Sequence, residues 1–487
     1  MTTPKRASFT GQAPTEIASP PAEGTINSPQ PAVPLPKGYV EEEYFIGGTA
    51  TRFAADDTPD SGEWAAAPAG TKRYRTRVIV RRPARAKDFS GTVLLEWLNV
   101  SAIEASPDWA FMNDEIGRAG HAYIAVSAQA QGVEGGKTLL DVEVDPDQAK
   151  QFGGEPDKSG LKHVDPARYD TLAHPGDAYA YDIYSQVARA LSEKPQQLIA
   201  DLQPKQVIAV GESQSAAFLT TLANAIHPLD PVFDGFLIHS RGANGAPLDG
   251  AIRRRGDPDD SSVITNQAVR VRTDLDVPVL IFETETDLTL LGYAEARQPD
   301  TDRLRTWEVA GTAHADAHLI RSIVGGPRDP SIGSLLGCEA PINTGPQHEV
   351  LQAALSQLVT WVDTGTPPPT SPRIELDDGN PPAIKRADDG IAIGGIRNPL
   401  VDVPVAATTG DPPGGAVELR TGGSVCALFG STTTFDQATL VDRYGTANNY
   451  LQQFRTSARE AVAAGFLLQA DADKLIAEAE TNRARFD

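Results

Sequence analysis

Three residues whose side chains combine in acyl-transfer chemistry follow one another along the chain: Ser213, Asp287 and His314. A serine hydroxyl becomes a good nucleophile only when a base removes its proton, and histidine suits that task near neutral pH. A carboxylate on the other imidazole nitrogen fixes the tautomer and stabilises the imidazolium that forms. These residue types therefore predict a nucleophile, a general base and an orienting acid.

The surroundings of Ser213 favour the nucleophilic role. Residues 207–210 form an apolar run typical of a buried parallel strand, and helical spacing resumes at 216–222. A serine in the sharp turn between strand and helix forms a nucleophile elbow, which lifts the hydroxyl above the sheet. The turn reads Gly-x-Ser-x-Ser, because Ser215 stands where a second glycine is usual. The structural alternative is that Ser213 is only a small residue in a tight turn.

The candidate general base is His314, which follows an apolar strand predicted at 304–309. The carboxyl ends of parallel strands share one edge of a sheet, so the loops there can converge on one site. The order serine, acid, histidine is the order found in α/β-hydrolases. The structural alternative is a loop histidine that caps the next helix, and His318, one helical turn later, is then the alternative base.

The candidate acid lies in a segment with three carboxylates that follows the strand predicted at 277–282. Asp287 is favoured, because it stands where that strand has run out. Glu285 is the alternative acid, and Glu283 is also near. The carboxylates that do not orient His314 would cap the turn or support the histidine indirectly.

The oxyanion of the reaction needs N–H donors, which are commonly worth about 3 kcal/mol apiece. One donor is expected to be the backbone N–H of Gln214, at the start of the helix. The second is expected from Asn99 or Val100, after the strand predicted at 91–98. Three further side chains lie on segments that could line a substrate pocket, and each is equally well explained as structural: Trp97, Trp109 and His174.

The elements that must position these residues alternate between strand and helix. The expected strands are 39–47, 73–82, 91–100, 122–127, 207–210, 233–239, 277–282 and 304–309, and the expected helices are 110–120, 177–191, 216–222 and 348–362. After the first strands, which read as antiparallel, this alternation predicts a mostly parallel, doubly wound sheet.

The chain divides by composition into three parts. Residues 1–36, rich in proline, serine and threonine, are expected to be a disordered or extended N-terminal arm. Residues 37–366 are the expected catalytic domain, with lid-like or decorative insertions near 131–175 and 241–276. Residues 367–487 are an expected C-terminal β and helical extension, packed on the main sheet because its own apolar content is thin.

The chain resembles the α/β-hydrolases, and more narrowly the bacterial α/β-hydrolase-domain proteins with a Gly-Glu-Ser-Gln-Ser elbow. The segments that carry the resemblance run from about Pro36 to the C-terminus: 97–100, 174–177, 211–215, 284–287 and 308–316. The resemblance implies an α/β fold with a mostly parallel central sheet flanked by helices, lid-like insertions and an extra C-terminal region. It also implies hydrolysis of an ester or related acyl bond without a metal or an organic cofactor.

The bulk composition narrows the classes of partner and cofactor that this protein is expected to have. The 487 residues include 43 Lys and Arg against 65 Asp and Glu, for a net charge of −22. Such a surface repels phosphate backbones and anionic lipid, so neither a nucleic acid nor a membrane is an expected partner. The sequence lacks the metal, P-loop and dinucleotide motifs. No secretory signal or membrane span is visible, and Cys338 and Cys426 are expected to be reduced thiols in a cytoplasmic protein; the alternative is one bridge between them.

These observations predict a serine esterase that acts on a small-molecule carboxylic ester through an acyl-enzyme, with no cofactor and no metal. The first alternative is an acyltransferase that uses the same three residues but delivers the acyl group to an alcohol or amine. The second is a non-catalytic binding protein on a hydrolase fold. The identity of the ester and the oligomeric state are left open by the sequence.

Overall fold

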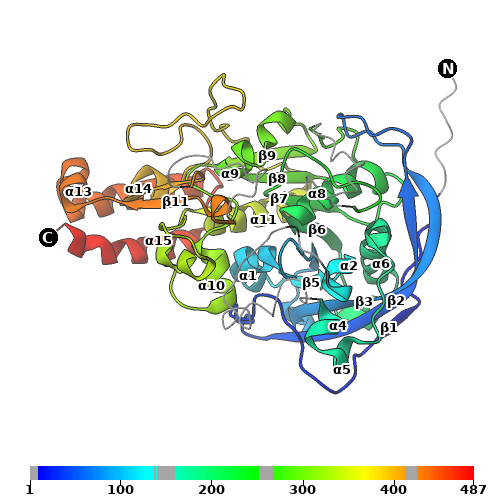
Figure 1. Cartoon of the computed structure of the whole chain (residues 1–487). Helices are drawn as coiled ribbons and strands as arrows, with labels where there is room; N and C mark the ends of the chain where they lie inside the picture. The colour runs from blue at the N-terminus through cyan, green and yellow to red at the C-terminus, as the bar shows by residue number, and fades with distance from the viewer. Residues whose placement is uncertain (1–8, 137–138, 140–159, 252–267, 413–424, 487) are drawn as a thin grey trace. The chain divides into compact units, whose positions relative to one another are not determined.

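In the computed structural model, the described residues are 9–136, 139, 160–251, 268–412 and 425–486 (Figure 1). The chain forms two compact units, each described by itself below. The first consists of Met1–Val279 and Glu295–Arg303, and the second of Leu280–Ala294 and Leu304–Asp487. The division falls inside the strand Val279–Thr284, and the domain boundary expected near residue 366 stays a prediction.

The first unit is built on a sheet with the strand order β1-β2-β3-β5-β4-β6-β7. The strands are β1 Glu16–Ala18, β2 Tyr39–Ala54, β3 Ala67–Pro83, β4 Thr92–Trp97, β5 Ala122–Val126, β6 Gln206–Glu212 and β7 Gly235–His239. Strands β1, β2, β3 and β5 pair antiparallel, whereas β5, β4, β6 and β7 pair parallel. Every residue of β4 and β5 is buried, as the apolar runs predict for parallel strands covered on both faces.

Helices connect these strands in the order that the sequence predicts. The first unit contains α1 Pro107–Ala119, α2 Ala130–Glu134, α4 Leu161–Val164, α5 Pro166–Tyr169, α6 Ala180–Glu193, α7 Gln196–Ile199, α8 Gln214–Thr221 and the π-helical turn η4 Leu222–Ile226. Helix α1 has proline at its first position and ends at Gly120, whose φ of 75° is the left-handed conformation that glycine favours. Helix α8 contacts β6 and β7, so the elbow helix packs on the strand that leads into it.

The N-terminal segment runs extended along the first unit. Strand β1 pairs antiparallel with β2, and the Asn27 carbonyl accepts from the buried Arg77 guanidinium. The Gln30 side chain accepts hydrogen bonds from both the N–H and the hydroxyl of Ser106, at the start of α1. Residues 9–36 are therefore tied to the unit by specific contacts. The expected insertions near 131–175 and 241–276 fall partly on residues outside the described ranges, namely 137–138, 140–159 and 252–267.

The second unit contains two neighbouring strands of a sheet, a small hairpin and a group of helices. Its elements are β8 Val279–Thr284, α9 Glu285–Thr289, β9 Leu304–Val309, α10 Ala317–Val324, α11 Gln347–Thr364, α12 Pro399–Asp402, β10 Ala406–Thr409, β11 Ser431–Thr434, α13 Gln437–Tyr444, α14 Ala447–Ala463 and α15 Gln469–Glu480. The described residues of the two units also form short 3₁₀ helices: η1 Ala86–Asp88, η3 Asp177–Tyr179, η5 Tyr293–Ala296, η6 Pro330–Leu336, η8 Val425–Phe429 and η9 Thr481–Arg485.

The C-terminal helices have a hydrophobic core of their own. Leu440, Tyr450, Phe454 and Leu475 are almost completely buried in a cluster formed by α13, α14 and α15 (orange to red in Figure 1). The prediction that this region lacks enough apolar surface for a separate core is therefore wrong. The apolar side chains are few but recur at helical spacing, so each helix presents one continuous face to the cluster.

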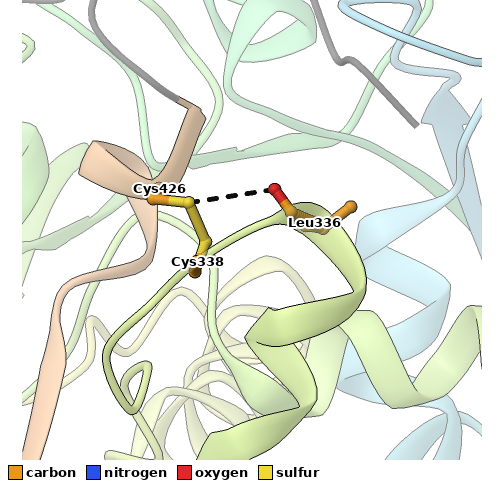
Figure 2. The surroundings of a disulfide bond; sticks show 3 residues. All are labelled: Leu336, Cys338 and Cys426. Atoms are coloured by element: carbon orange, nitrogen blue, oxygen red, sulfur yellow. Dashed lines mark hydrogen bonds between the residues drawn. A yellow bond between two sulfur atoms is a disulfide. The ribbon is translucent and has the colours of Figure 1, made fainter. Parts of the chain in front are cut away.

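A disulfide joins Cys338 to Cys426 in the second unit (Figure 2). The expectation of two reduced thiols is not met, and the bridge considered as the alternative is present. The bond closes a loop of 88 sequence positions, and the Cys426 Sγ also lies 4.0 Å from the Leu336 carbonyl oxygen.

None of the helices within the described ranges is long and apolar enough to cross a membrane.

Candidate active site

The turn between β6 and α8 holds Ser213 in a conformation that side chains rarely adopt. Its φ is 60° and its ψ is −117°, and its N–H donates to the His239 carbonyl oxygen at 2.9 Å. A non-glycine residue at positive φ costs about 1–3 kcal/mol and persists only where its surroundings over-determine it. Ser213 stays partly exposed, although both of its neighbours in the chain are buried. The turn therefore has the geometry that the elbow pattern predicts.

Close packing beneath this turn explains its two small residues. A Cβ added to Gly211 would lie 3.0 Å from Leu219 Cδ1 and 3.1 Å from Ser215 Cβ. A larger residue at position 211 would therefore push its neighbours aside, whereas the space around position 215 accepts a serine. The Ser215 side chain is fully buried, and its hydroxyl has no hydrogen-bond partner among the described residues. The departure from the usual second glycine is thus accommodated by packing.

The loop after β4 is joined to the elbow by two side-chain amides. The Asn99 Nδ2 donates to the Glu212 carbonyl and carboxylate oxygens, both at 3.1 Å, and the Gln214 Oε1 accepts from the Val100 N–H at 3.2 Å. The N–H of Asn99 donates to the Ala105 carbonyl oxygen at 3.0 Å. Of the two N–H groups expected as second oxyanion donor, that of Asn99 is thus held by a backbone acceptor. The N–H of Val100 is held only by a side chain.

In the second unit, His314 and Asp287 lie in direct contact. The His314 Nδ1 is 2.7 Å from the Asp287 Oδ1, and the Asp287 side chain is fully buried. The other carboxylate oxygen, Oδ2, accepts from the N–H and from the hydroxyl of Thr284, each at 2.7 Å, in the capping box that opens α9. In the tautomer that carries its proton on Nδ1, His314 donates to the Asp287 Oδ1, and its Nε2 is then the nitrogen that accepts a proton.

The Glu285 carboxylate has different partners. Its Oε1 accepts from the Gly311 N–H at 2.6 Å, and its Oε2 accepts from the Gly410 N–H at 2.9 Å and pairs with Arg386 at 2.9 Å. Burial raises the pKa of Glu285 above its ordinary value, and the Arg386 charge opposes that shift. Gly311 lies three residues before His314, so Glu285 anchors the start of the histidine loop.

The candidates His318, Trp97 and Glu283 are buried side chains. His318, at the start of α10, stacks on His348 of α11 with ring centroids 4.0 Å apart. Trp97 is fully buried and stacks on Phe218 of α8 at 4.9 Å. Glu283, the second-last residue of β8, is also fully buried.

Trp109 and His174 are held by contacts inside the first unit. Trp109 is buried beneath the Arg81 guanidinium, which lies 4.5 Å from its ring. The His174 Nε2 lies 2.8 Å from the Ala128 carbonyl oxygen, and its Nδ1 accepts from the Gly176 N–H. Burial lowers the pKa of His174, which favours this neutral imidazole.

Sequence reasoning missed the residues that support the histidine loop from the late part of the chain. The Ala315 N–H donates to the Leu428 carbonyl oxygen at 3.0 Å, and the Asn343 side chain donates to the Gly311 carbonyl oxygen at 3.1 Å. Arg386 reaches the same loop through Glu285. No local pattern marks these residues, because each acts on a partner far away in the sequence.

The fold and the serine turn define an α/β protein of the hydrolase type. A family model described as an alpha/beta hydrolase domain matches residues 12–477, so the chain belongs to that family and the predicted fold class is confirmed. A search of curated proteins found no match.

Solved structures with similar folds were also found. They include a thermostable esterase from Pseudomonas putida ECU1011, at 11% identity over 63% of this chain and 84% of that one, with a TM-score of 0.31. An esterase from Rhizomucor miehei matches at 12% identity over 63% and 84%, with a TM-score of 0.28. Acetyl xylan esterase 1 from Thermoanaerobacterium matches at 12% over 53% and 80%, with a TM-score of 0.26.

Proposed function

We propose that this protein is a serine esterase in which Ser213, His314 and Asp287 act as nucleophile, general base and orienting acid. The observation that carries the proposal is the conformation of Ser213, at positive φ between β6 and α8. The short contact between His314 and Asp287 supports it, because it joins the two other residue types that the reaction needs.

In the proposed reaction, the Ser213 Oγ attacks the ester carbonyl while the His314 Nε2 takes its proton. Collapse of the tetrahedral intermediate breaks the bond to the alkoxy group, which leaves as the alcohol with the proton from Nε2. Water, activated by the same nitrogen, then attacks the acyl-enzyme. This step releases the carboxylic acid and restores the Ser213 hydroxyl.

The proposed oxyanion donors are the backbone N–H groups of Gln214 and Val100. Gln214 is the first residue of α8, so its N–H has no acceptor within the helix and lies at the positive end of the helix dipole. This chemistry requires no metal or organic cofactor. Within the described residues, no cluster of three or more histidine, cysteine or carboxylate side chains could hold a metal ion.

The proposed partner is a small-molecule ester, with no nucleic acid or membrane involved. The cytoplasmic location inferred from the sequence stays a prediction. Because disulfides such as Cys338–Cys426 persist mainly in oxidising compartments, counting free thiols in freshly lysed cells checks it. Two free thiols per chain would support the cytoplasmic prediction, and none would contradict it.

The proposal is tested by Ser213→Ala, with Ser215→Ala as the matched control. Both changes remove one hydroxyl from the same turn, but the Ser215 hydroxyl is buried without a hydrogen-bond partner in the described chain. Ser213→Ala is expected to lower kcat on an aryl ester by about 10⁴-fold or more, and Ser215→Ala by less than about three-fold. A fluorophosphonate should label the wild type only at Ser213. Retained hydrolysis in Ser213→Ala would show that the assignment is wrong, and acyl transfer to an added alcohol in place of hydrolysis would identify an acyltransferase.

A further inference from the structure

The first four N–H groups after β4, those of residues 98–101, all donate hydrogen bonds in the structure. The N–H of Leu98 donates to the Val126 carbonyl oxygen at 3.2 Å, and that of Asn99 donates to the Ala105 carbonyl oxygen at 3.0 Å. The N–H of Ser101 donates to the Asn99 side-chain oxygen at 2.8 Å. The acceptors of Leu98 and Asn99 are backbone carbonyl oxygens, so neither can leave without a movement of the backbone.

The N–H of Val100 differs from those of Leu98 and Asn99, because its acceptor is a side chain. It donates at 3.2 Å to the Oε1 of Gln214, the residue that directly follows Ser213. A glutamine side chain rotates about three single bonds, so it can leave this N–H while the backbone stays in place. The Asn99 side chain that accepts from Ser101 is itself held by two hydrogen bonds to Glu212, whereas the acceptor on Val100 belongs to the residue next to Ser213. A substrate oxygen could therefore reach the Val100 N–H through a movement of the Gln214 side chain alone.

We propose that the Gln214 side chain is a resting-state placeholder for the oxyanion. Its Oε1 is a carbonyl oxygen, the same kind of atom as the acyl oxygen of an ester. Gln214 also carries the other proposed oxyanion donor, its backbone N–H at the start of α8. The inference rests on the proposed function and adds to it a positioning residue whose side chain must leave before the acyl oxygen is bound.

The placeholder explains how the loop keeps its geometry without substrate. An unpaired N–H in a buried loop is unfavourable, and residues 98, 99 and 100 are all buried. With Gln214 Oε1 in place, the donor direction of Val100 is already set when the ester arrives. The cost is a hydrogen bond that each substrate molecule must displace.

The test compares Gln214→Met and Gln214→Glu with wild type, and uses Gln206→Met as the control. Methionine keeps the length of the side chain but cannot accept strongly, so the ester no longer competes for Val100. Gln214→Met is expected to raise kcat/KM on an aryl ester about five-fold, the factor for one neutral hydrogen bond. Gln214→Glu keeps the acceptor and adds a negative charge beside the oxyanion, so kcat/KM is expected to fall by about 100-fold or more.

The control removes a glutamine amide from the start of β6, the strand that leads into the Ser213 turn. Gln206 begins β6 and donates to the Thr92 hydroxyl at 2.8 Å, so Gln206→Met is expected to leave kcat/KM within about two-fold of wild type. Hydrogen exchange of the peptide containing Val100 gives a second readout that does not depend on catalysis. Exchange at Val100 should be faster in Gln214→Met than in wild type.

The possible results separate this inference from the proposed function. Activity retained in Ser213→Ala overturns the proposed function. If Ser213→Ala is inactive and Gln214→Met lowers kcat/KM or leaves it unchanged, the side chain is a fixed brace and the placeholder inference is overturned. Unchanged exchange at Val100 in Gln214→Met overturns it as well, because the contact would then not protect that N–H.

Discussion

Replacing Asp287 with asparagine is expected to remove nearly all activity while leaving the fold intact. The reason lies in the partners of the two carboxylate oxygens. The Oδ2 accepts from both the N–H and the hydroxyl of Thr284, and the Oδ1 faces the His314 Nδ1 at 2.7 Å. An asparagine has only one acceptor oxygen, and the backbone N–H of Thr284 requires it.

The amide NH₂ of the new residue must then point at His314. It donates to Nδ1, which selects the tautomer with its proton on Nε2, and this nitrogen can no longer take a proton from Ser213. The corresponding change in serine enzymes lowers kcat by about 10⁴-fold, which is about 5.5 kcal/mol of transition-state stabilisation. Since the helix cap keeps its acceptor, the midpoint of thermal unfolding should move by only about 4 °C or less.

The assay is kcat on an aryl ester together with the rate of fluorophosphonate labelling at Ser213, both measured across pH. Glu285→Gln is the matched variant, because it makes the same chemical change in the neighbouring acid. It is expected to lower stability by about 1–3 kcal/mol through its lost pairing with Arg386 and to lower kcat far less than Asp287→Asn. If folded Asp287→Asn keeps kcat within ten-fold of wild type, or if Glu285→Gln is the more damaging change, Asp287 does not orient the base.

Three further changes test the packing and electrostatics of the structure. Gly211→Ala places a Cβ 3.0 Å from Leu219 Cδ1 and should destabilise by about 1–3 kcal/mol in denaturant unfolding, with reduced labelling of Ser213; wild-type values for both would contradict the packing argument. Burial raises the pKa of Asp316 from 3.8 to about 6, so the folded protein favours the neutral acid and loses stability as pH rises between those values. Asp316→Asn keeps the helix-cap acceptor and should therefore raise the unfolding free energy at pH 8 by up to about 3 kcal/mol and very little at pH 4; an equal effect at both pH values would disprove the shift. Reducing the Cys338–Cys426 bridge, or making Cys426→Ser, should lower the free energy of unfolding by about 2–4 kcal/mol, and no change under reducing conditions would show that the bridge is not formed in solution.

Much of the fold could be predicted because local sequence patterns indicate its individual strands and helices. The strand predicted at 304–309 is β9 with the same bounds, and the strand at 122–127 is β5 to within one residue. Both are short apolar runs between turn residues, and such continuous runs are typical of strands that are buried on both faces. The elbow was readable for a similar reason, since strand, glycine, serine and helix lie within a few residues.

The support of the candidate site could not be predicted in the same way. The contact between Glu285 and Gly410 spans 125 positions, and neither residue carries a signal that names the other. The sequence favours Asp287 as the acid and leaves Glu285 as the alternative, because the two alternate along the same strand end and no local signal shows the partners of either. The separate core of the C-terminal helices was missed because thin apolar content was counted without regard to its helical spacing.

The connection of Glu285 to Gly410 and Arg386 has a consequence for how the protein is made. A ribosome releases residues 285–314 well before residue 386, so the histidine loop emerges without the groups that later anchor it. Leu428, whose carbonyl accepts from the Ala315 N–H, is released later still. The loop that holds His314 therefore gains its last contact only after translation has passed position 428. A nascent chain stalled before that point would lack the contacts that Gly410 and Leu428 make with Glu285 and with this loop.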